Sequence, residues 1–186
     1  KTISTLKEKD LTNYRRNHLG YVFQMYNLIS HLNVEQNIDV GKYLSKNPLD
    51  KEELLQTLGL KEHRYKQPNQ LSGGQQQRVW IAMALAQKTP YLLLDEPTTY
   101  LDIRYQLELL RLLKEINQKY KITIIMVLHD INQAIQYSDN IIAIKKGRII
   151  VEGKSNEVIT SEVIREIYGI DLKMTQLSKQ PYVFTV

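Results

Sequence analysis

The sequence predicts an α/β fold organised around a parallel β-sheet. Two short runs, 91–94 and 122–128, are apolar without alternation, which is typical of strands that are covered on both faces. A helical pattern fills the segment between them. A strand, a helix and a second strand in succession imply a right-handed crossover and a parallel pair. Ligands of such sheets bind just beyond the carboxyl ends of the strands.

Composition narrows the class of protein. A chain of 186 residues, 42% of them hydrophobic and 24% charged, fits one globular domain, 1–186. No apolar run reaches the ~18 residues that a membrane helix needs, and no secretion signal opens the chain. The absence of cysteine excludes disulfides and thiolate zinc sites and fits a reducing compartment. The net charge of +5 is dispersed along the chain, so we expect solvated faces and no nucleic-acid partner.

The elements of the first half follow in order. Segment 19–24 reads as a short buried strand that ends on Gln24, and 25–33 reads as a loop. Helices are expected at 34–46 and 51–58. Pro48 breaks the first of these helices, and Asp50 is placed to cap the second.

A glycine-rich turn then leads into a helix. Leu71-Ser72-Gly73-Gly74 precedes a pattern with Val79, Ala82, Met83 and Ala86 on one apolar face. Paired glycines let backbone N–H groups approach an anion, and the start of a helix favours negative charge. The turn is therefore a candidate phosphate contact.

The second half repeats the alternation. The strand at 91–94 ends in Asp95-Glu96, a helix is expected at 103–119, and the strand at 122–128 ends at His129. A hairpin is expected around 145–147, with strands 141–144 and 148–151, followed by helices 155–159 and 161–168. The parallel sheet would gather Gln24, Asp95, Glu96 and His129 at one edge.

Such a group suits phosphoryl transfer, which needs a carboxylate for Mg2+, a second carboxylate to orient water, and polar groups near the terminal phosphate. Taken alone, Asp95-Glu96 is equally compatible with a helix cap and surface charge.

The surrounding motifs favour the first interpretation. Leu71-Ser72-Gly73-Gly74-Gln75-Gln76-Gln77-Arg78 resembles the signature motif of ATP-binding-cassette (ABC) ATPases, and Leu94-Asp95-Glu96-Pro97 resembles a Walker B motif. The resemblance covers nearly the whole chain. It implies that ATP and Mg2+ are the cofactors, with Asp95 and Gln24 at the metal and Glu96 and His129 in catalysis. It further implies nucleotide contacts by Gln24, Ser72, Gly73, Gly74, Gln75 and the D-loop residue Asp102.

The resemblance also implies a P-loop NTPase-type parallel sheet with an inserted helical subdomain at about 28–78. The family's P-loop, G-x-x-x-x-G-K-[ST], occurs nowhere in the sequence. Gly153-Lys154-Ser155 mimics only its end and is expected to be a turn that opens a helix. The resemblance makes Gln24 the glutamine of the family's Q-loop. Because the P-loop precedes the Q-loop in the family, we expect an N-terminally truncated cassette, inactive by itself.

The two halves resemble different subfamilies. Segment 6–77 is similar to ATPases of lipoprotein release and antimicrobial-peptide export, whereas the chain from Val79 onward is similar to ATPases of iron-siderophore importers. This difference leads to the hypothesis that two related genes recombined at the shared signature motif.

The function implied is that of an ATPase subunit that energises transport through separate membrane permease subunits and pairs with a second ABC ATPase subunit. It would lie in the cytoplasm, peripherally on the inner face of the cell membrane, and the Q-loop and the segment from about 28 to 70 would contact the permease. An ATPase acting on DNA or ribosomes is disfavoured by the short insertion between Gln24 and Leu71. A non-catalytic partner or gene remnant, offering only the signature motif, is the alternative.

Overall fold

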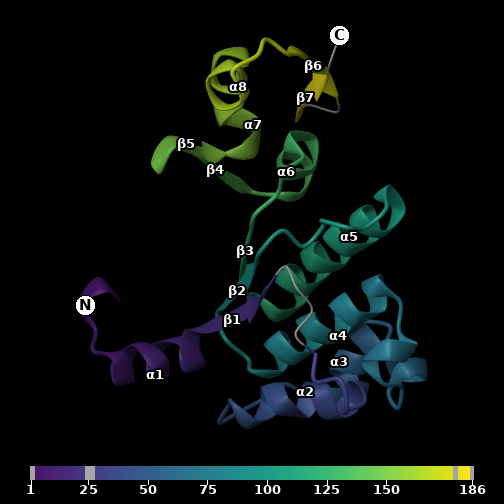
Figure 1. Ribbon diagram of the computed structural model, residues 1–186. Coiled ribbons are helices and arrows are strands. Elements are labelled where there is room, and N and C mark those ends of the chain that lie inside the picture. Colours follow the sequence, from purple (N-terminus) through teal and green to yellow (C-terminus); the bar gives the residue numbers. More distant parts are fainter. Residues whose placement is uncertain (1–2, 24–27, 178–179, 185–186) are drawn as a thin grey trace. The chain divides into compact units, whose positions relative to one another are not determined.

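The computed structural model describes residues 3–23, 28–177 and 180–184, so Gln24 lies outside the described residues (Figure 1). The chain divides into two compact units, Lys1–Val127 and Leu128–Val186. The first unit opens with a 3-10 turn, η1 (Ile3–Thr5), and helix α1 (Glu8–His18), neither of which the sequence pattern predicted. Helix α1 contains no buried residue, and therefore offers no apolar face for a pattern to detect.

A three-stranded parallel sheet forms the centre of this unit and confirms the α/β expectation. Its strands are β1 (Leu19–Val22), β2 (Tyr91–Leu94) and β3 (Thr123–Met126), in the order β1-β2-β3. Val22, Leu94 and Met126 stand side by side at the carboxyl edge. The polar residues that follow β2 in the sequence, Asp95 and Glu96, therefore begin at this edge.

Two long helices cover one face of the sheet. Helix α4 (Gly73–Ala86) packs on β1, and helix α5 (Ile103–Tyr120) packs on β3 (Figure 1). The indole of Trp80 donates a hydrogen bond of 3.2 Å to the carbonyl of Tyr21. The sheet residues on this face, Val22, Leu92 and Leu94, are at most 2% exposed. This face therefore supplies the main hydrophobic core of the unit.

Among the described residues the opposite face is largely exposed, so the expectation that 91–94 and 122–128 are covered on both faces is wrong. Tyr21, Leu93 and Ile125 align across the three strands on this face. Tyr21 is 41% exposed and Ile125 is 53% exposed. Covering a sheet face depends on segments distant in sequence, so an apolar run alone cannot report it.

We expect this open apolar face to drive self-association. Replacing Ile125 by Thr keeps the β-branched shape and removes apolar surface, so self-association measured by sedimentation should fall at unchanged unfolding free energy. The matched control is Ile124→Thr, which packs against the core and should lower the unfolding free energy. Equal effects of the two variants on both measurements would contradict the assignment of faces.

Short helices between β1 and α4 form the helical part of the unit. They are α2 (Val34–Tyr43), α3 (Lys51–Thr57), η2 (Lys61–His63) and η3 (Pro68–Gln70). The Asp50 carboxylate accepts a hydrogen bond of 2.9 Å from the Glu53 amide, which confirms the predicted cap. These helices fall within segment 28–78, where the inserted subdomain is expected.

Ion pairs hold these helices together. The guanidinium of Arg64 lies 2.8 Å from Glu35 of α2 and 2.7 Å from Glu52 of α3. The hydrogen bonds to Glu35 and then to Glu52 raise the pKa of Arg64. Lys119 of α5 lies 2.8 Å from Glu53, and its hydrogen bond lowers the pKa of that carboxyl. Segments far apart in sequence are thus joined through charged hydrogen bonds.

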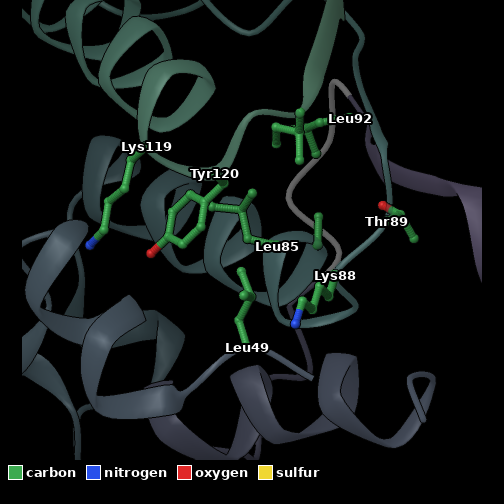
Figure 2. A pocket seen from close by; sticks show the side chains of 9 residues that line it. Leu49, Leu85, Lys88, Thr89, Leu92, Lys119 and Tyr120 are labelled. Carbon is green, nitrogen blue, oxygen red and sulfur yellow. The ribbon is translucent and has the colours of Figure 1, made fainter. Parts of the chain in front are cut away.

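A cavity of about 220 Å³ lies at the amino-terminal end of β2, between the ends of α4 and α5 (Figure 2). Its lining is mainly apolar, with Leu85, Leu92 and Tyr120 among the residues, and the side chains of Lys88 and Lys119 also contribute. The carboxyl ends of the strands, where Asp95 follows Leu94, lie at the other edge of the sheet. This cavity is therefore separate from the predicted phosphate contacts.

The second unit combines helices with two antiparallel hairpins. Its elements are α6 (Ile131–Tyr137), β4 (Asn140–Lys145), β5 (Arg148–Lys154), α7 (Ser155–Val158), α8 (Ser161–Tyr168), β6 (Lys173–Leu177) and β7 (Gln180–Phe184). Strand β4 pairs with β5 through the predicted turn, where Gly147 has φ 75°. The expected turn at Gly153-Lys154 is wrong, because both residues belong to strand β5, where they pair with β4. The expected helix does begin at Ser155.

The sequence pattern did not predict α6 or the hairpin formed by β6 and β7. The side chain of Asn132 joins these elements, since it donates to the Val183 carbonyl and accepts from the Val183 amide, both at 2.8 Å. Within the described ranges of both units, no helix is long and apolar enough to cross a membrane.

Candidate functional site

The signature turn is held by a complete capping box at the start of α4. The hydroxyl of Ser72 accepts from the Gln75 amide at 3.3 Å, and the Gln75 side-chain oxygen accepts from the Ser72 amide at 2.9 Å. The nitrogen of the same side chain lies 2.9 Å from Nε2 of His63. Both ends of the Gln75 side chain are therefore engaged, and the helix start is fixed.

The two glycines after Ser72 are not required by the fold of this chain. Neither has a positive φ. A Cβ added to Gly73 would meet nothing within 4 Å, and one added to Gly74 would meet only Tyr105 Cδ1, at 3.8 Å. Glycine in a helix costs about 1 kcal/mol relative to alanine. The turn thus leaves open space beside two backbone N–H groups that have no intrahelical acceptor.

The two carboxylates begin directly at the edge of the sheet. The amide of Asp95 donates to the Val22 carbonyl at 3.0 Å, so the residue continues from β2 alongside β1. Glu96 has a left-handed backbone with φ 49°, which is unfavourable for a residue with a side chain. Its carboxylate accepts a hydrogen bond of 3.1 Å from the hydroxyl of Thr99. Strained backbone of this kind is typical of functional sites.

A tight turn links the carboxylates to α5. The Thr99 amide donates to the Glu96 carbonyl at 3.2 Å, and Tyr100 has φ 65° with its side chain 84% exposed. Asp102 caps α5 by accepting from the Tyr105 amide at 3.1 Å. The segment from Glu96 to Asp102 is therefore an ordered bridge between strand and helix.

Part of the predicted site lies within one unit of the structure. Ser72–Gly74, Asp95, Glu96 and Asp102 all belong to the first unit, where the side chain of Gln77 in α4 donates to the Pro97 carbonyl. His129 belongs to the second unit, directly before Asp130, whose side chain caps α6. Gln24 lies outside the described residues. The sequence pattern did not predict the hydrogen bonds of Gln75 with His63 and of Gln77 with Pro97. The run of three glutamines at the start of an apolar helix is the only sequence signal for them.

No group of three or more histidine, aspartate or glutamate side chains gathers as a metal site in the ranges 3–23, 28–177 and 180–184. The carboxylates that follow β2 at the sheet edge are those of Asp95 and Glu96. Such a donor set fits Mg2+, which keeps several waters and is commonly bound by one or two carboxylates together with substrate phosphates.

Comparison with known proteins decides the family. The family model described as ABC transporter matches residues 2–99. The chain belongs to the ABC transporter family. It is an ATP-binding subunit by its likeness to curated ABC ATP-binding proteins. The petrobactin import ATP-binding protein FpuC of Bacillus anthracis is 41% identical over 98% of this chain and 69% of its own length.

Two further relatives support the assignment of this ABC subunit. The iron(3+)-hydroxamate import ATP-binding protein FhuC of Bacillus subtilis is 50% identical over 64% of the chain and 45% of its own length. The ATP-binding cassette MJ0796, solved as a dimer bound to ADP and phosphate, superposes with a TM-score of 0.69 at 36% identity. That match covers 81% of this chain and 68% of the solved chain. The chain thus spans roughly half to two thirds of these relatives.

Proposed function

We propose that this chain binds and hydrolyses ATP to drive import of iron-siderophore complexes through separate permease subunits at the cytoplasmic face of the membrane. Relatives named for petrobactin import and for iron(3+)-hydroxamate import support this cargo. The lipoprotein or peptide export suggested by segment 6–77 has less support, since FpuC is an import protein and matches 98% of the chain.

The observation that carries this proposal is the capped turn at Ser72–Gly74. Gln75 and His63 hold the helix start, yet the chain itself uses neither glycine for packing or for a positive φ. Open space, two unused N–H groups and a helix N-terminus together make an anion site. A phosphate group from outside the chain fits this combination.

In the proposed mechanism, the N–H groups of Gly73 and Gly74 donate to terminal phosphate oxygens of an ATP molecule held by a second cassette subunit. A hydroxyl accepts and donates at once, so Ser72 can keep its bond from the Gln75 amide and donate its proton to phosphate. The positive end of α4 adds to this attraction, which grows as charge develops during transfer.

Glu96 is proposed to orient the attacking water and to accept its proton as the bond to the terminal phosphorus forms and the bond to ADP breaks. The hydroxyl of Thr99 holds the Glu96 carboxylate in place. Asp95 would hold Mg2+, which neutralises charge on the phosphates. From the resemblance, Gln24 is proposed to contact the metal, and His129 is proposed to contact the terminal phosphate.

In this proposal a second cassette subunit holds the ATP molecule that the signature turn of this chain contacts. The 186-residue chain by itself is expected to bind MgATP weakly. Mixed with a complete siderophore-import subunit such as FpuC, it should support hydrolysis of the ATP bound by that subunit.

In this mixture Glu96→Gln in the present chain should change the hydrolysis rate little, since the catalysed site uses the carboxylate of the complete subunit. Steady-state phosphate release, compared with the unsubstituted chain, measures the effect. A loss of activity comparable with that of the corresponding substitution in the complete subunit would contradict the division of roles.

The permease contact is proposed to lie at the carboxyl end of α2. Tyr43 is 83% exposed there, beside Leu44, and a surface hollow of about 440 Å³ is lined by Asp39, Lys42, Tyr43 and Ser45. The Leu44 carbonyl accepts from Arg16 at 2.8 Å, which fixes this end of the helix. An exposed aromatic side chain on a helix end that is held by a hydrogen bond is a suitable anchor for a partner protein.

Replacing Tyr43 by Glu should weaken permease binding at least about tenfold, because the substitution removes an aromatic anchor and adds a charge. The matched control is Tyr65→Glu, since Tyr65 is 71% exposed and lies beyond η2. Co-purification with permease subunits in detergent measures the effect, and circular dichroism checks folding. Equal retention of both variants would contradict this docking position.

A further inference from the structure

Three consecutive glutamines at the start of α4 hold three different segments. Gln75 closes the capping box and contacts His63. The Gln76 side chain donates to the carbonyls of Pro68, at 2.8 Å, and Leu71, at 3.3 Å. The Gln77 side chain donates to the Pro97 carbonyl. The first two contacts stay near the signature turn, whereas the third reaches the segment that follows β2.

The Gln77 side chain is unusual because it is buried while only one of its two polar atoms has a hydrogen-bond partner. Its nitrogen has an acceptor, and its oxygen has no donor among the described residues. The residue is 3% exposed. A carbonyl can only accept, so the side chain must present its nitrogen to Pro97, and its oxygen has no hydrogen-bond partner among the described residues. Leaving a buried acceptor without a donor costs stability, and an apolar side chain of similar size would avoid that cost. A role beyond packing explains why a glutamine occupies this position.

Pro97 is the central residue of the strained turn. Glu96, immediately before it, has φ 49°, and Thr99 bonds back to Glu96 through both its amide and its hydroxyl. The amide of Leu101 donates to the Thr98 carbonyl at 3.4 Å. A hydrogen bond to the Pro97 carbonyl therefore acts on the whole turn that carries the Glu96 carboxylate.

We propose that Gln77 is a positioning residue that fixes the Glu96–Leu101 turn to the signature end of α4. Gly73 and Gln77 lie on one continuous helix, whose N-cap is Ser72, and Pro97 and Glu96 are adjacent. A shift of the helix start on nucleotide contact is thereby passed to the turn that orients Glu96. This inference rests on the proposed function, because Gly73, Gly74 and Glu96 have those roles only in a cassette ATPase.

Gln77→Met in the 186-residue chain tests the inference, because methionine keeps the length and volume of the side chain but cannot donate. Amide hydrogen exchange, read by mass spectrometry at low micromolar concentration, is expected to rise at least about fivefold in a peptide covering 95–102. The free energy of unfolding in urea is expected to stay the same or increase, since the unsatisfied buried oxygen is removed.

Gln76→Met is the matched control on the same helix. It should raise exchange around 68–71, where the Gln76 side chain donates, and leave 95–102 unchanged. Unaltered exchange of 95–102 in Gln77→Met would overturn the proposal. So would a fall in unfolding free energy with a uniform rise in exchange, which is the signature of a merely structural residue. Neither readout uses nucleotide, so failure of ATP binding is distinguished from failure of this inference.

Discussion

Replacing Gly74 by aspartate is expected to abolish ATP hydrolysis that depends on this chain's signature turn, while leaving the chain as stable as before. The carboxylate would enter the space that now contains nothing nearer than Tyr105 Cδ1 at 3.8 Å, and would repel phosphate. Loss of such a preorganised contact costs about 100-fold or more in rate. An acidic residue in the first turn of a helix contributes about 0.3–1 kcal/mol of stability, so the unfolding free energy should not fall.

Phosphate release by the mixture with a complete cassette subunit measures the first effect, and urea unfolding of the chain measures the second. Gly74→Ala is the matched control, since it adds a methyl group without charge and should lose less activity. Retention of full activity by Gly74→Asp would contradict the placement of phosphate at this turn. A loss of activity that merely follows a loss of stability would contradict it equally.

Gly41→Ala is expected to lower the free energy of unfolding by about 3 kcal/mol, at the upper end of the cost of overpacking. A Cβ at this position would lie 2.0 Å from the Met83 carbonyl oxygen and 2.9 Å from its carbon. These are backbone atoms of α4, so α2 and α4 must separate, and the buried Ile38 on the same helix loses contacts. The gain of about 1 kcal/mol in helix propensity does not offset this loss.

The control for this variant is Gly73→Ala, because a Cβ there meets nothing within 4 Å. Its unfolding free energy should rise by up to about 1 kcal/mol from helix propensity alone. Urea unfolding of both variants under the same conditions makes the comparison. If Gly41→Ala were as stable as the original chain, the close approach of the two helices would be wrong.

Much of the fold was predictable because its signals are local. The cap residue Asp50, the glycine-rich turn before α4 and the apolar run of β2 identify their elements without reference to the rest of the chain. Helix α1 was missed because it buries no side chain and its residues are mostly polar or charged. The open face beside Ile125 was missed because covering a strand depends on distant segments.

The candidate site shows the same difference between local sequence signals and contacts made by distant segments. Motif spacing located Ser72–Gly74 and the Asp95-Glu96 pair, since each motif is contiguous in sequence. The contacts of Gln75 with His63 and of Gln77 with Pro97 join residues that are 12 and 20 positions apart. Apart from the run of three glutamines, neither pairing has a local sequence signal. Tertiary packing alone determines that these glutamines hold the turn and the carboxylate segment.

ATP-dependent association with a complete cassette subunit tests most directly whether the turn at Ser72–Gly74 contacts nucleotide. The complete subunit would carry a glutamine in place of its catalytic carboxylate, so that bound ATP persists, and sedimentation would report the mixed pair. We predict association with this chain in MgATP, none in MgADP, and none in MgATP when the chain carries Gly74→Asp. Association that is independent of ATP, or is unaffected by Gly74→Asp, would contradict that contact.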